Sequence, residues 1–210
     1  MKASLEVSKD IAKGLLDTKA VFLRPDDMFT WASGIKSPIY CDNRITLSYP
    51  KVRDLVKKSF VSMVLSKFPA AEYIAGVATA GIPQATLIAD EMNLPLIYVR
   101  SGAKDHGRTN QIEGYLEPGA KVVVIEDLIS TGSSAINAMH TLQDAGADVL
   151  GLLAIFDYQL LKSVKNFADI DLPYYSLCGY DELVEVALEN GYVKESDIDF
   201  LKDWRNSIED

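Results

Sequence analysis

The sequence has little of what marks secreted, membrane-spanning or metal-cluster proteins. Its 210 residues include only two cysteines, Cys41 and Cys178, which form neither a disulfide framework nor a group of metal ligands. Unpaired, widely spaced cysteines are typical of the reducing cytosol. No stretch reaches the roughly 18 apolar residues of a membrane span, and the N-terminus alternates charged and apolar residues where a signal peptide has a continuous apolar core. We therefore expect a cytoplasmic protein that does not bind membranes.

Positive charge is also scarce. Lysine and arginine number 21 against 30 acidic residues, which gives a net charge of −9. Proteins that bind nucleic acids usually carry a basic surface, so this balance argues against such a partner. A phosphorylated small molecule remains possible, because backbone N–H groups and a metal ion can bind phosphate on an acidic protein. With 48% hydrophobic residues and neither repeat nor linker, the chain is expected to form a single domain over residues 1–210.

Short apolar runs alternate with helical patterns through the middle of the chain. Strands are predicted at residues 73–77, 96–99, 122–125 and 149–156, and helices at 51–68, 83–92 and 133–145. This alternation predicts an α/β fold with a central, mostly parallel sheet flanked by helices. Ligands bind such sheets at the C-terminal ends of the strands. The flanking regions predict a helix at 5–16, an extended hairpin at 29–40, a strand near 174, and helices at 181–190 and 196–206.

Residues 101–119 interrupt this pattern. They contain few large apolar side chains and the glycines Gly102, Gly107 and Gly114, together with Lys104, Asp105, His106 and Arg108. A long polar segment inside a compact domain is usually functional or disordered. The composition indicates a mobile loop, and its charges indicate contact with an anion.

Two carboxylates and a run of hydroxyls follow the apolar run at 122–125. Glu126 and Asp127 are expected at the C-terminal end of that strand, where adjacent carboxylates repel each other unless something bridges them. The vicinal hydroxyls of a ribose or a hydrated Mg²⁺ ion would bridge them. Residues 130–134 then supply a glycine turn, hydroxyl groups and a helix start, whose exposed N–H groups attract phosphate. The combination predicts a site for a ribose 5-phosphate group.

Two other interpretations of this segment were weighed. Either half alone is more often a buried strand or a serine-capped polar turn. An acidic pair after an apolar strand is also found in P-loop nucleotide hydrolases, but the G-x-x-x-x-G-K-[ST] sequence that they need is absent. The turn at residues 79–83 is similarly open to two interpretations, as a diphosphate-binding loop or a plain strand–helix connection.

Three segments resemble one family. Residues 122–134 are similar to the 5-phosphoribosyl 1-diphosphate (PRPP) motif of type I phosphoribosyltransferases. The segment Arg100-Ser-Gly-Ala-Lys104-Asp105-His106-Gly107 resembles the mobile catalytic loop of orotate phosphoribosyltransferases, and residues 29–40 resemble that family's N-terminal hood over the base. The resemblance implies the type I phosphoribosyltransferase fold, with a hood region at 1–48, a core at 49–210 and a mobile loop at 101–115.

The resemblance also implies an activity and a set of site residues. The activity is transfer of the 5-phosphoribosyl group from PRPP to orotate, which gives orotidine 5-monophosphate and diphosphate in de novo pyrimidine (UMP) biosynthesis. Lys104 and His106 are the implied catalytic residues. The implied PRPP-binding residues are Arg100, Lys104, His106, Glu126, Asp127, Leu128, Ile129, Ser130, Thr131, Gly132, Ser133 and Ser134. Those implied for orotate are Ser130, Lys36 and Tyr40.

The same resemblance implies a cofactor and a partner. Mg²⁺ would be held mainly by PRPP, with no dedicated protein ligand. A homodimer is implied, in which loop 101–115 of each subunit completes the neighbouring site. Arg44 matches no functional position and is expected to form a surface or interface ion pair.

Four positions depart from the family pattern. Some members have a basic residue where this chain has Ala32, Ala80, Ser101 and Tyr158. The last of these contacts the orotate carboxylate in those members, so the partner of that carboxylate here stays open between Lys36 and backbone N–H groups of the hood. Two alternatives stay open. A purine phosphoribosyltransferase shares the fold but would lack this hood and loop, and a non-catalytic PRPP sensor would need a DNA-binding module.

Overall fold

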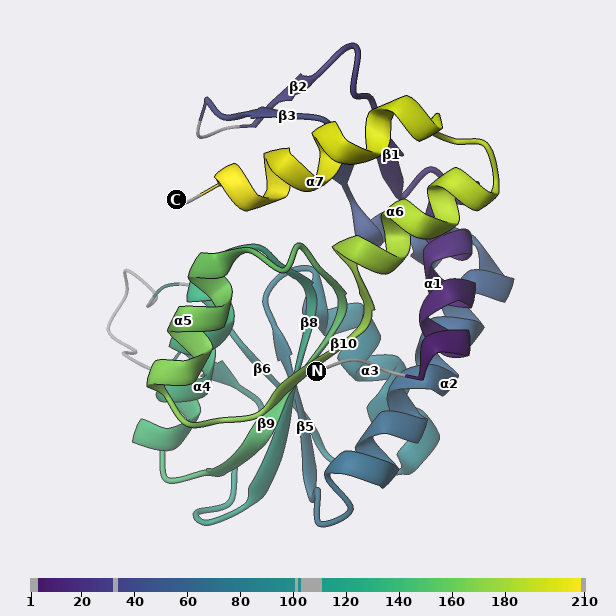
Figure 1. Ribbon diagram of the computed structural model, residues 1–210. Coiled ribbons are helices and arrows are strands. Elements are labelled where there is room, and N and C mark those ends of the chain that lie inside the picture. The colour runs from purple at the N-terminus through teal and green to yellow at the C-terminus, as the bar shows by residue number, and fades with distance from the viewer. Residues whose placement is uncertain (1–3, 32–33, 101, 103–110, 209–210) are drawn as a thin grey trace.

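A six-stranded sheet forms the centre of the protein. The computed structural model describes residues 4–31, 34–100, 102 and 111–208 (Figure 1). The strands run in the order β10-β9-β8-β5-β6-β7, and all neighbours are parallel except β6 and β7. Their bounds are β5 (Tyr73–Val77), β6 (Leu96–Val99), β7 (Ile112–Glu113), β8 (Lys121–Ile129), β9 (Asp148–Asp157) and β10 (Tyr174–Gly179). The predicted fold class is confirmed.

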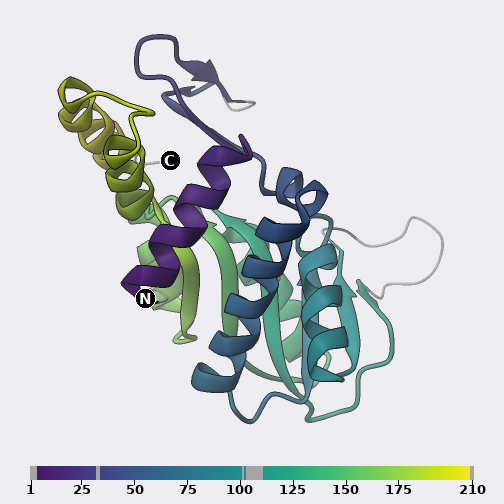
Figure 2. The same cartoon turned by 90° about the vertical axis from the view of Figure 1, so that its right-hand side faces the viewer.

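Helices cover both faces of the sheet, because successive side chains of each strand point to opposite faces. Ile74 and Val123 contribute to one apolar core, whereas Ala75 and Val124 contribute to the other. The first core lies under α1 (Leu5–Asp17), α2 (Pro50–Lys67) and α3 (Gly81–Met92), which stand side by side in Figure 2. The second lies under α4 (Ser133–Asp144) and α5 (Leu161–Asp169). Among the described residues, no helix combines the length and apolarity needed to cross a bilayer.

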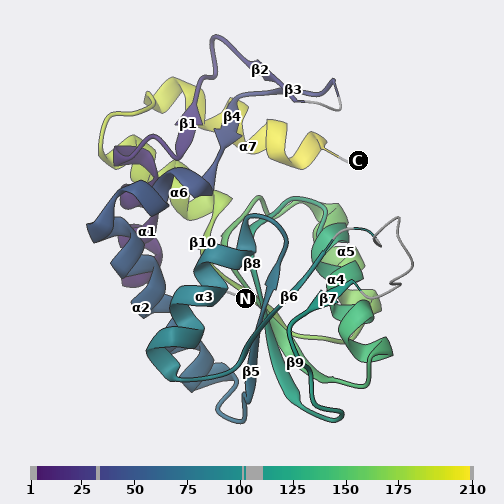
Figure 3. The same ribbon diagram turned by 180° about the vertical axis from the view of Figure 1, so that it is seen from behind.

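A smaller layer lies over the C-terminal ends of the strands, and Figure 3 shows it from behind. Its N-terminal part consists of two antiparallel strand pairs and a 3-10 helix: β1 (Val21–Leu23) with β4 (Ile39–Cys41), β2 (Phe29–Thr30) with β3 (Lys36–Ser37), and η1 (Asn43–Ser48). Its C-terminal part is α6 (Tyr180–Glu189), η2 (Glu195–Asp197) and α7 (Ile198–Ser207). We call this whole layer the hood.

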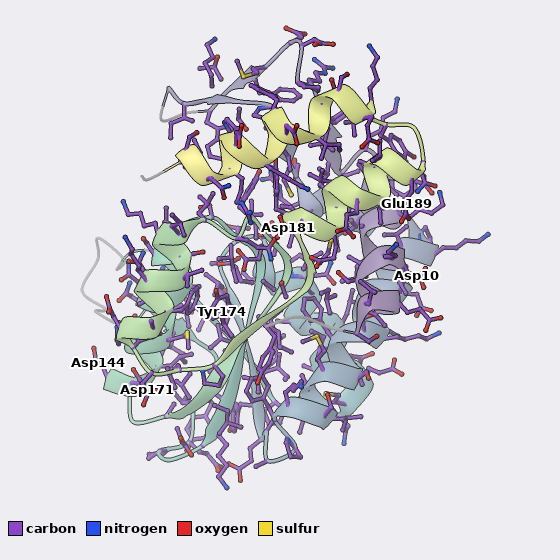
Figure 4. All side chains as sticks on the ribbon, in the orientation of Figure 1. Asp10, Asp144, Asp171, Tyr174, Asp181 and Glu189 are labelled. Atoms are coloured by element: carbon purple, nitrogen blue, oxygen red, sulfur yellow. The ribbon has the colours of Figure 1, made fainter. Side chains whose placement is uncertain are left out.

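The two parts of the hood are joined through Trp204. Its indole Nε1 donates a 2.9 Å hydrogen bond to the backbone oxygen of Lys36, and its ring meets Trp31 edge-on at 5.8 Å. An ion pair of 3.3 Å between Arg205 and Asp181 ties α7 to α6, and Figure 4 labels Asp181 at the start of α6. The C-terminal helix therefore supports the strand that carries Lys36. The division of the chain at residue 48 stays a prediction.

Replacing Trp204 with phenylalanine is expected to lower the Tm. The ring contacts would be retained in part, but the hydrogen bond to the Lys36 carbonyl would be lost. A buried hydrogen bond contributes about 1 kcal/mol, so we expect a fall of roughly 2–4 °C for a chain of this size. Differential scanning fluorimetry measures the shift. Trp31→Phe removes an analogous bond to Ile39 and serves as the comparison, and an unchanged Tm for Trp204→Phe would contradict this role.

The structure differs from the sequence expectation at one important place. The strand expected to end at residue 125 continues to Ile129. Only the first part of β8 pairs with β5, as far as Ile125, whereas its pairing with β9 continues to Ile129 opposite Asp157. Glu126 and Asp127 thus lie within the strand and not after it. The acidic pair interrupts the apolar run, which is why hydrophobicity alone placed the end too early.

Candidate active site

The C-terminal ends of β5, β6, β8 and β9 meet beneath the hood, and Glu126, Asp127 and the turn at 130–134 lie at or after the end of β8. Glu126 is 7% exposed and Asp127 is half-buried, just beyond the end of the paired part of β5. The backbone N–H of Asp127 donates to Oε1 of Glu126 over 3.0 Å. This bond turns the Glu126 carboxylate back toward its neighbour and so holds the two acids as one unit.

The acidic pair is electrostatically unfavourable as it stands. Burial, and then the charge of Asp127, raises the pKa of Glu126 from 4.5 to about 9. Burial also raises the pKa of Asp127. Two adjacent carboxylates that are shielded from water repel each other. The repulsion is relieved only when a proton, a cation or hydrogen-bond donors lie between them. The arrangement is therefore suited to bind vicinal hydroxyl groups or a cation.

A phosphate-sized cradle follows the acidic pair directly. Gly132 has φ +79° and forms the N-cap of α4, and no side chain caps that helix start. Ser133 and Ser134 are exposed in the first turn, and Thr131 Oγ1 lies 3.1 Å from Ser133 Oγ. An uncapped helix N-terminus offers backbone N–H groups and a partial positive charge to an anion. This cradle can bind a phosphate dianion without any lysine or arginine.

Helix α5 supports the cradle from behind. Asn166 Nδ2 donates to the backbone oxygen of Thr131 over 2.9 Å. A Cβ atom on Gly132 would lie 2.6 Å from Cε2 of Phe167, whose ring stacks on Tyr174 at 4.0 Å. The glycine is thus required both by its backbone angle and by this ring. The sequence analysis missed both α5 and its two supporting side chains.

A pocket of about 210 Å³ adjoins the cradle. It is lined by Val77, Ala78, Val99, Arg100, Gln111, Ser134, Asn137, Ala138 and Thr141, and the Ala78–Thr79 peptide beside it is cis. Larger pockets of about 430, 460, 440 and 300 Å³ lie at α5–β10, on α2, between α1 and α2, and beside β1. Tyr174 and Asp171, labelled in Figure 4, mark the first of these. None of the four is lined by a residue of the acidic pair or the cradle, so the smaller pocket is the relevant one.

Arg100 lies at the wall of this pocket. Its backbone N–H bonds to the Gln111 oxygen at 2.9 Å, and Gln111 Nε2 returns a 3.2 Å bond to the Arg100 oxygen. The guanidinium Nη1 is 3.6 Å from Oε1 of Glu113. These contacts fix both ends of the segment predicted as the mobile loop. Lys104 and His106, with Ser101, lie outside the described residues.

The hood carries the remaining predicted residues. Lys36 is exposed, and its Nζ donates to Thr30 Oγ1 over 2.7 Å. Tyr40 is 42% exposed, and its ring packs on Phe29 at 5.6 Å. Ser130, the third residue predicted to meet the base, is half-buried between the acidic pair and the cradle.

Tyr158 stands where some relatives have an arginine. It is only 3% exposed, and its ring packs edge-on against Trp31 at 5.4 Å and Phe156 at 5.2 Å. Burial raises the pKa of its phenol well above the ordinary value, so the group stays uncharged. Tyr158 therefore forms part of the aromatic core under the hood and provides no positive charge.

One residue that links the hood to the acidic pair was also missed. Asn43 is 1% exposed, and its Nδ2 donates a 2.7 Å bond to the backbone oxygen of Asp127, 84 positions away. Its position three residues after Tyr40 was the only hint that the sequence offered. Nothing in the local pattern links it to the acidic segment.

Comparisons with known proteins agree on one family. The model of the phosphoribosyl transferase domain matches residues 47–173. The chain is similar to orotate phosphoribosyltransferase of Staphylococcus haemolyticus, with 54% identity over 96% of this chain and 100% of the relative, and to that of Bacillus subtilis, with 58% identity over 95% and 92%.

Solved structures give the same result. The structure of orotate phosphoribosyltransferase from Aeropyrum pernix has a TM-score of 0.76 and 27% identity, and the match covers 88% of this chain and 99% of that one. The Mycobacterium tuberculosis orotate phosphoribosyltransferase in complex with PRPP has a TM-score of 0.64 and 25% identity, covering 84% and 98%.

Proposed function

The chain belongs to the orotate phosphoribosyltransferases, within the type I phosphoribosyltransferases, and on that premise we propose which of its residues carry out the reaction. It is a glycosyltransferase of pyrimidine biosynthesis that moves the 5-phosphoribosyl group of PRPP to orotate, releasing diphosphate and forming orotidine 5-monophosphate. The residue assignments that follow are proposals.

The observation that carries the assignment is the continuity of the acidic pair with the phosphate cradle. Glu126 and Asp127 would accept hydrogen bonds from the 2- and 3-hydroxyls of the ribose, which relieves the repulsion between them. Residues 128–134 would surround the 5-phosphate, mostly through backbone N–H groups. Leu128 and Ile129 contribute backbone, while Ser130, Thr131, Ser133 and Ser134 add hydroxyls. Because the acidic pair and the cradle are neighbours in the chain, they would hold the ribose hydroxyls and the 5-phosphate of the same ligand.

The leaving diphosphate needs positive charge. Arg100, Lys104 and His106 are proposed to supply it with Mg²⁺, because charge builds on the diphosphate as its bond to the ribose carbon breaks. The described residues contain no group of three His, Cys, Asp or Glu side chains that could hold a metal. The ion would therefore be held mainly by oxygens of PRPP and by water, with no dedicated protein ligand.

The base is proposed to bind between the hood and the strand ends. Ser130, Lys36 and Tyr40 lie on the two sides of this space. The ribosyl carbon passes through a cation-like state that water would capture, so closure of loop 101–115 is proposed to exclude water. The ring nitrogen of orotate loses its proton as its bond to the ribose carbon forms, and no residue is assigned as the general base.

A base-specificity assay tests the function. The purified protein is incubated with PRPP, Mg²⁺ and orotate, hypoxanthine or adenine separately, and diphosphate release and nucleotide formation are measured. We expect turnover of orotate alone, and loss of that turnover when a chelator removes Mg²⁺. Turnover of a purine without orotate would favour the purine enzyme, and PRPP binding without any turnover would favour a sensor.

Replacing Lys104 by alanine is expected to lower kcat at least tenfold, because one charge that neutralises the leaving diphosphate is lost. The Tm should stay within about 1 °C, because the sequence predicts a loop outside the core at this position and such changes shift stability little. Steady-state assays and thermal melts measure both quantities. Lys51→Ala, a change of the same type at the exposed start of α2, is the matched control. Near wild-type turnover of the Lys104 variant would contradict the assignment of this loop to the diphosphate.

The homodimer can be tested with the same variant. If the loop of each subunit completes the neighbouring site, Lys104→Ala mixed with an inactive variant of the acidic pair should regain about a quarter of the wild-type activity, because half of the subunit pairs are hybrids with one intact site. Light scattering gives the oligomeric state. Activity no higher than the sum of the two variants would place the loop in its own subunit's site. The cytoplasmic location stays a prediction.

A further inference from the structure

The Asp42-Asn43-Arg44 turn of the hood rests against the acidic pair. Asn43 fixes it there through the 2.7 Å bond to the Asp127 oxygen, and Thr46 Oγ1 braces the turn with a 2.6 Å bond to the Asn43 oxygen. Both of these side chains are buried, with exposures of 1% and 0%. The residue that follows Asn43 is therefore held at the boundary between the hood and the acidic strand end.

Arg44 is oriented within this turn by Asp42. Its Nε and Nη2 donate to the two oxygens of that carboxylate at 2.7 and 2.8 Å, and its backbone N–H donates to Asp42 Oδ1 at 3.2 Å. The Arg44 side chain is 64% exposed, whereas that of Asp42 is 20% exposed. No described residue accepts a bond from Nη1, so the Nη1 side of the planar group faces outward. A guanidinium held along one edge in this way can still donate two parallel bonds from another.

Arg44 interacts electrostatically with groups of both the hood and the acidic strand end. Hydrogen bonding to Asp42 raises the pKa of Arg44, and the charges of Asp127 and Tyr40 act in the same direction. Burial raises the pKa of Asp127, and the positive charge of Arg44 opposes that rise. Arg44 is thus electrostatically close both to the acidic pair and to a residue proposed to meet the base.

The site lacks an assigned cation for the orotate carboxylate. Tyr158 is uncharged and enclosed by aromatic rings, and Arg100 is already proposed to meet the diphosphate. The exposed Lys36 is a candidate, but its ammonium group is engaged by Thr30 on β2. A planar guanidinium already fixed by a carboxylate matches the flat carboxylate of orotate better than a flexible ammonium does.

We propose that Arg44, oriented by Asp42 and seated by Asn43, binds the carboxylate of orotate and so distinguishes orotate from uracil. The inference rests on the proposed base site between hood and strand ends. It concerns specificity for the base, because orotidine 5-monophosphate and UMP have the same ribose and phosphate groups. In this proposal the ion pair with Asp42 orients the guanidinium group of Arg44 and is not only a surface contact.

The test compares two nucleotides that differ only in that carboxylate. Isothermal titration calorimetry measures Kd for orotidine 5-monophosphate and for UMP with the wild type and with Arg44→Gln, Arg24→Gln and Lys36→Met. Arg24 is the matched control, because it is an exposed hood arginine that stacks on Phe29 at 5.0 Å. In the wild type we expect roughly 10- to 30-fold tighter binding of orotidine 5-monophosphate, as for a charge-assisted pair.

Arg44→Gln should reduce that preference to within about threefold while leaving Kd for UMP unchanged, whereas Arg24→Gln should keep it. Arg44→Lys should restore part of the preference, because a point charge remains. A preference that survives in Arg44→Gln, or that is lost only in Lys36→Met, overturns the inference. Equal binding of both nucleotides by the wild type also overturns it, and orotate turnover in the same preparation then shows whether the proposed function fails with it.

Discussion

Replacing Glu126 by glutamine is expected to make the ligand-free protein more stable and the enzyme at least about 100-fold less active in kcat/KM for PRPP. The glutamine oxygen can still accept the N–H of Asp127, which Glu126 Oε1 accepts at 3.0 Å. What disappears is a buried carboxyl group beside a second one, which in the empty site must keep its proton at a pH where the unfolded chain releases it. That requirement costs stability in the ligand-free protein, whereas the ionised carboxylate is proposed to hold the ribose hydroxyls in the occupied site. Stability and activity should therefore change in opposite directions.

The pH dependence fixes the sign of the stability effect. A carboxyl whose pKa is higher in the folded protein binds its proton more tightly when folded, so its contribution to the free energy of unfolding is present in full below the unfolded pKa and is lost as the pH rises through the folded value. For Glu126 this window runs from 4.5 to about 9. Glutamine removes this loss, so the Tm of the variant should exceed that of the wild type by roughly 3–8 °C at pH 8, and the two should converge near pH 5.

Thermal melts of the ligand-free proteins from pH 5 to 9, with kinetics at pH 8, test this expectation. Glu117→Gln is the matched control, since it removes the same charge from an exposed position between β7 and β8. A Glu126→Gln variant that is less stable than the wild type at pH 8 would show that the carboxylate is structural. A stabilised Glu126→Gln variant that keeps full activity would show that the Glu126 carboxylate does not bind the ribose.

Replacing Gly132 by alanine is expected to disable the phosphate cradle and destabilise the fold. Two effects add together at this position. A φ of +79° costs a residue with a Cβ atom about 1–2 kcal/mol, and the new Cβ would lie 2.6 Å from Cε2 of Phe167. The ring is stacked on Tyr174 and has little room to move, so the loop must shift instead. We expect kcat/KM for PRPP to fall at least about 100-fold, because misplaced N–H groups no longer meet the 5-phosphate.

Gly146 separates the two effects. It has φ +89°, but no atom lies within 4 Å of a Cβ built on it. Gly146→Ala should therefore suffer only the backbone cost, with a Tm about 4 °C lower and unchanged kinetics, whereas Gly132→Ala should lose about 8 °C or more. Differential scanning fluorimetry and steady-state assays decide. Similar losses of activity in both variants would contradict the cradle assignment, and similar losses of Tm would show that Phe167 yields easily.

The sequence predicted the central sheet well because its strands are continuous apolar runs, which the burial of both faces requires. Helix α5 was missed although Leu161, Val164 and Phe167 recur at helical spacing in it, because a helix of nine residues shows only a short stretch of that pattern. The acidic pair was found because two adjacent charged residues seldom interrupt a buried apolar strand by chance. Asn43 and Trp204 were not, since their partners lie 84 and 168 positions away and long-range pairing leaves no local pattern.

The closure of the hood by Trp204 has a consequence for the order of folding. Its partner Lys36 is separated from it by 168 positions, and the intervening chain forms the whole sheet. Joining ends so far apart is favourable only after that chain has become compact. The sheet and its phosphate cradle are therefore expected to assemble first and the hood to close last, so that during folding the protein gains its ribose phosphate site before its site for the base.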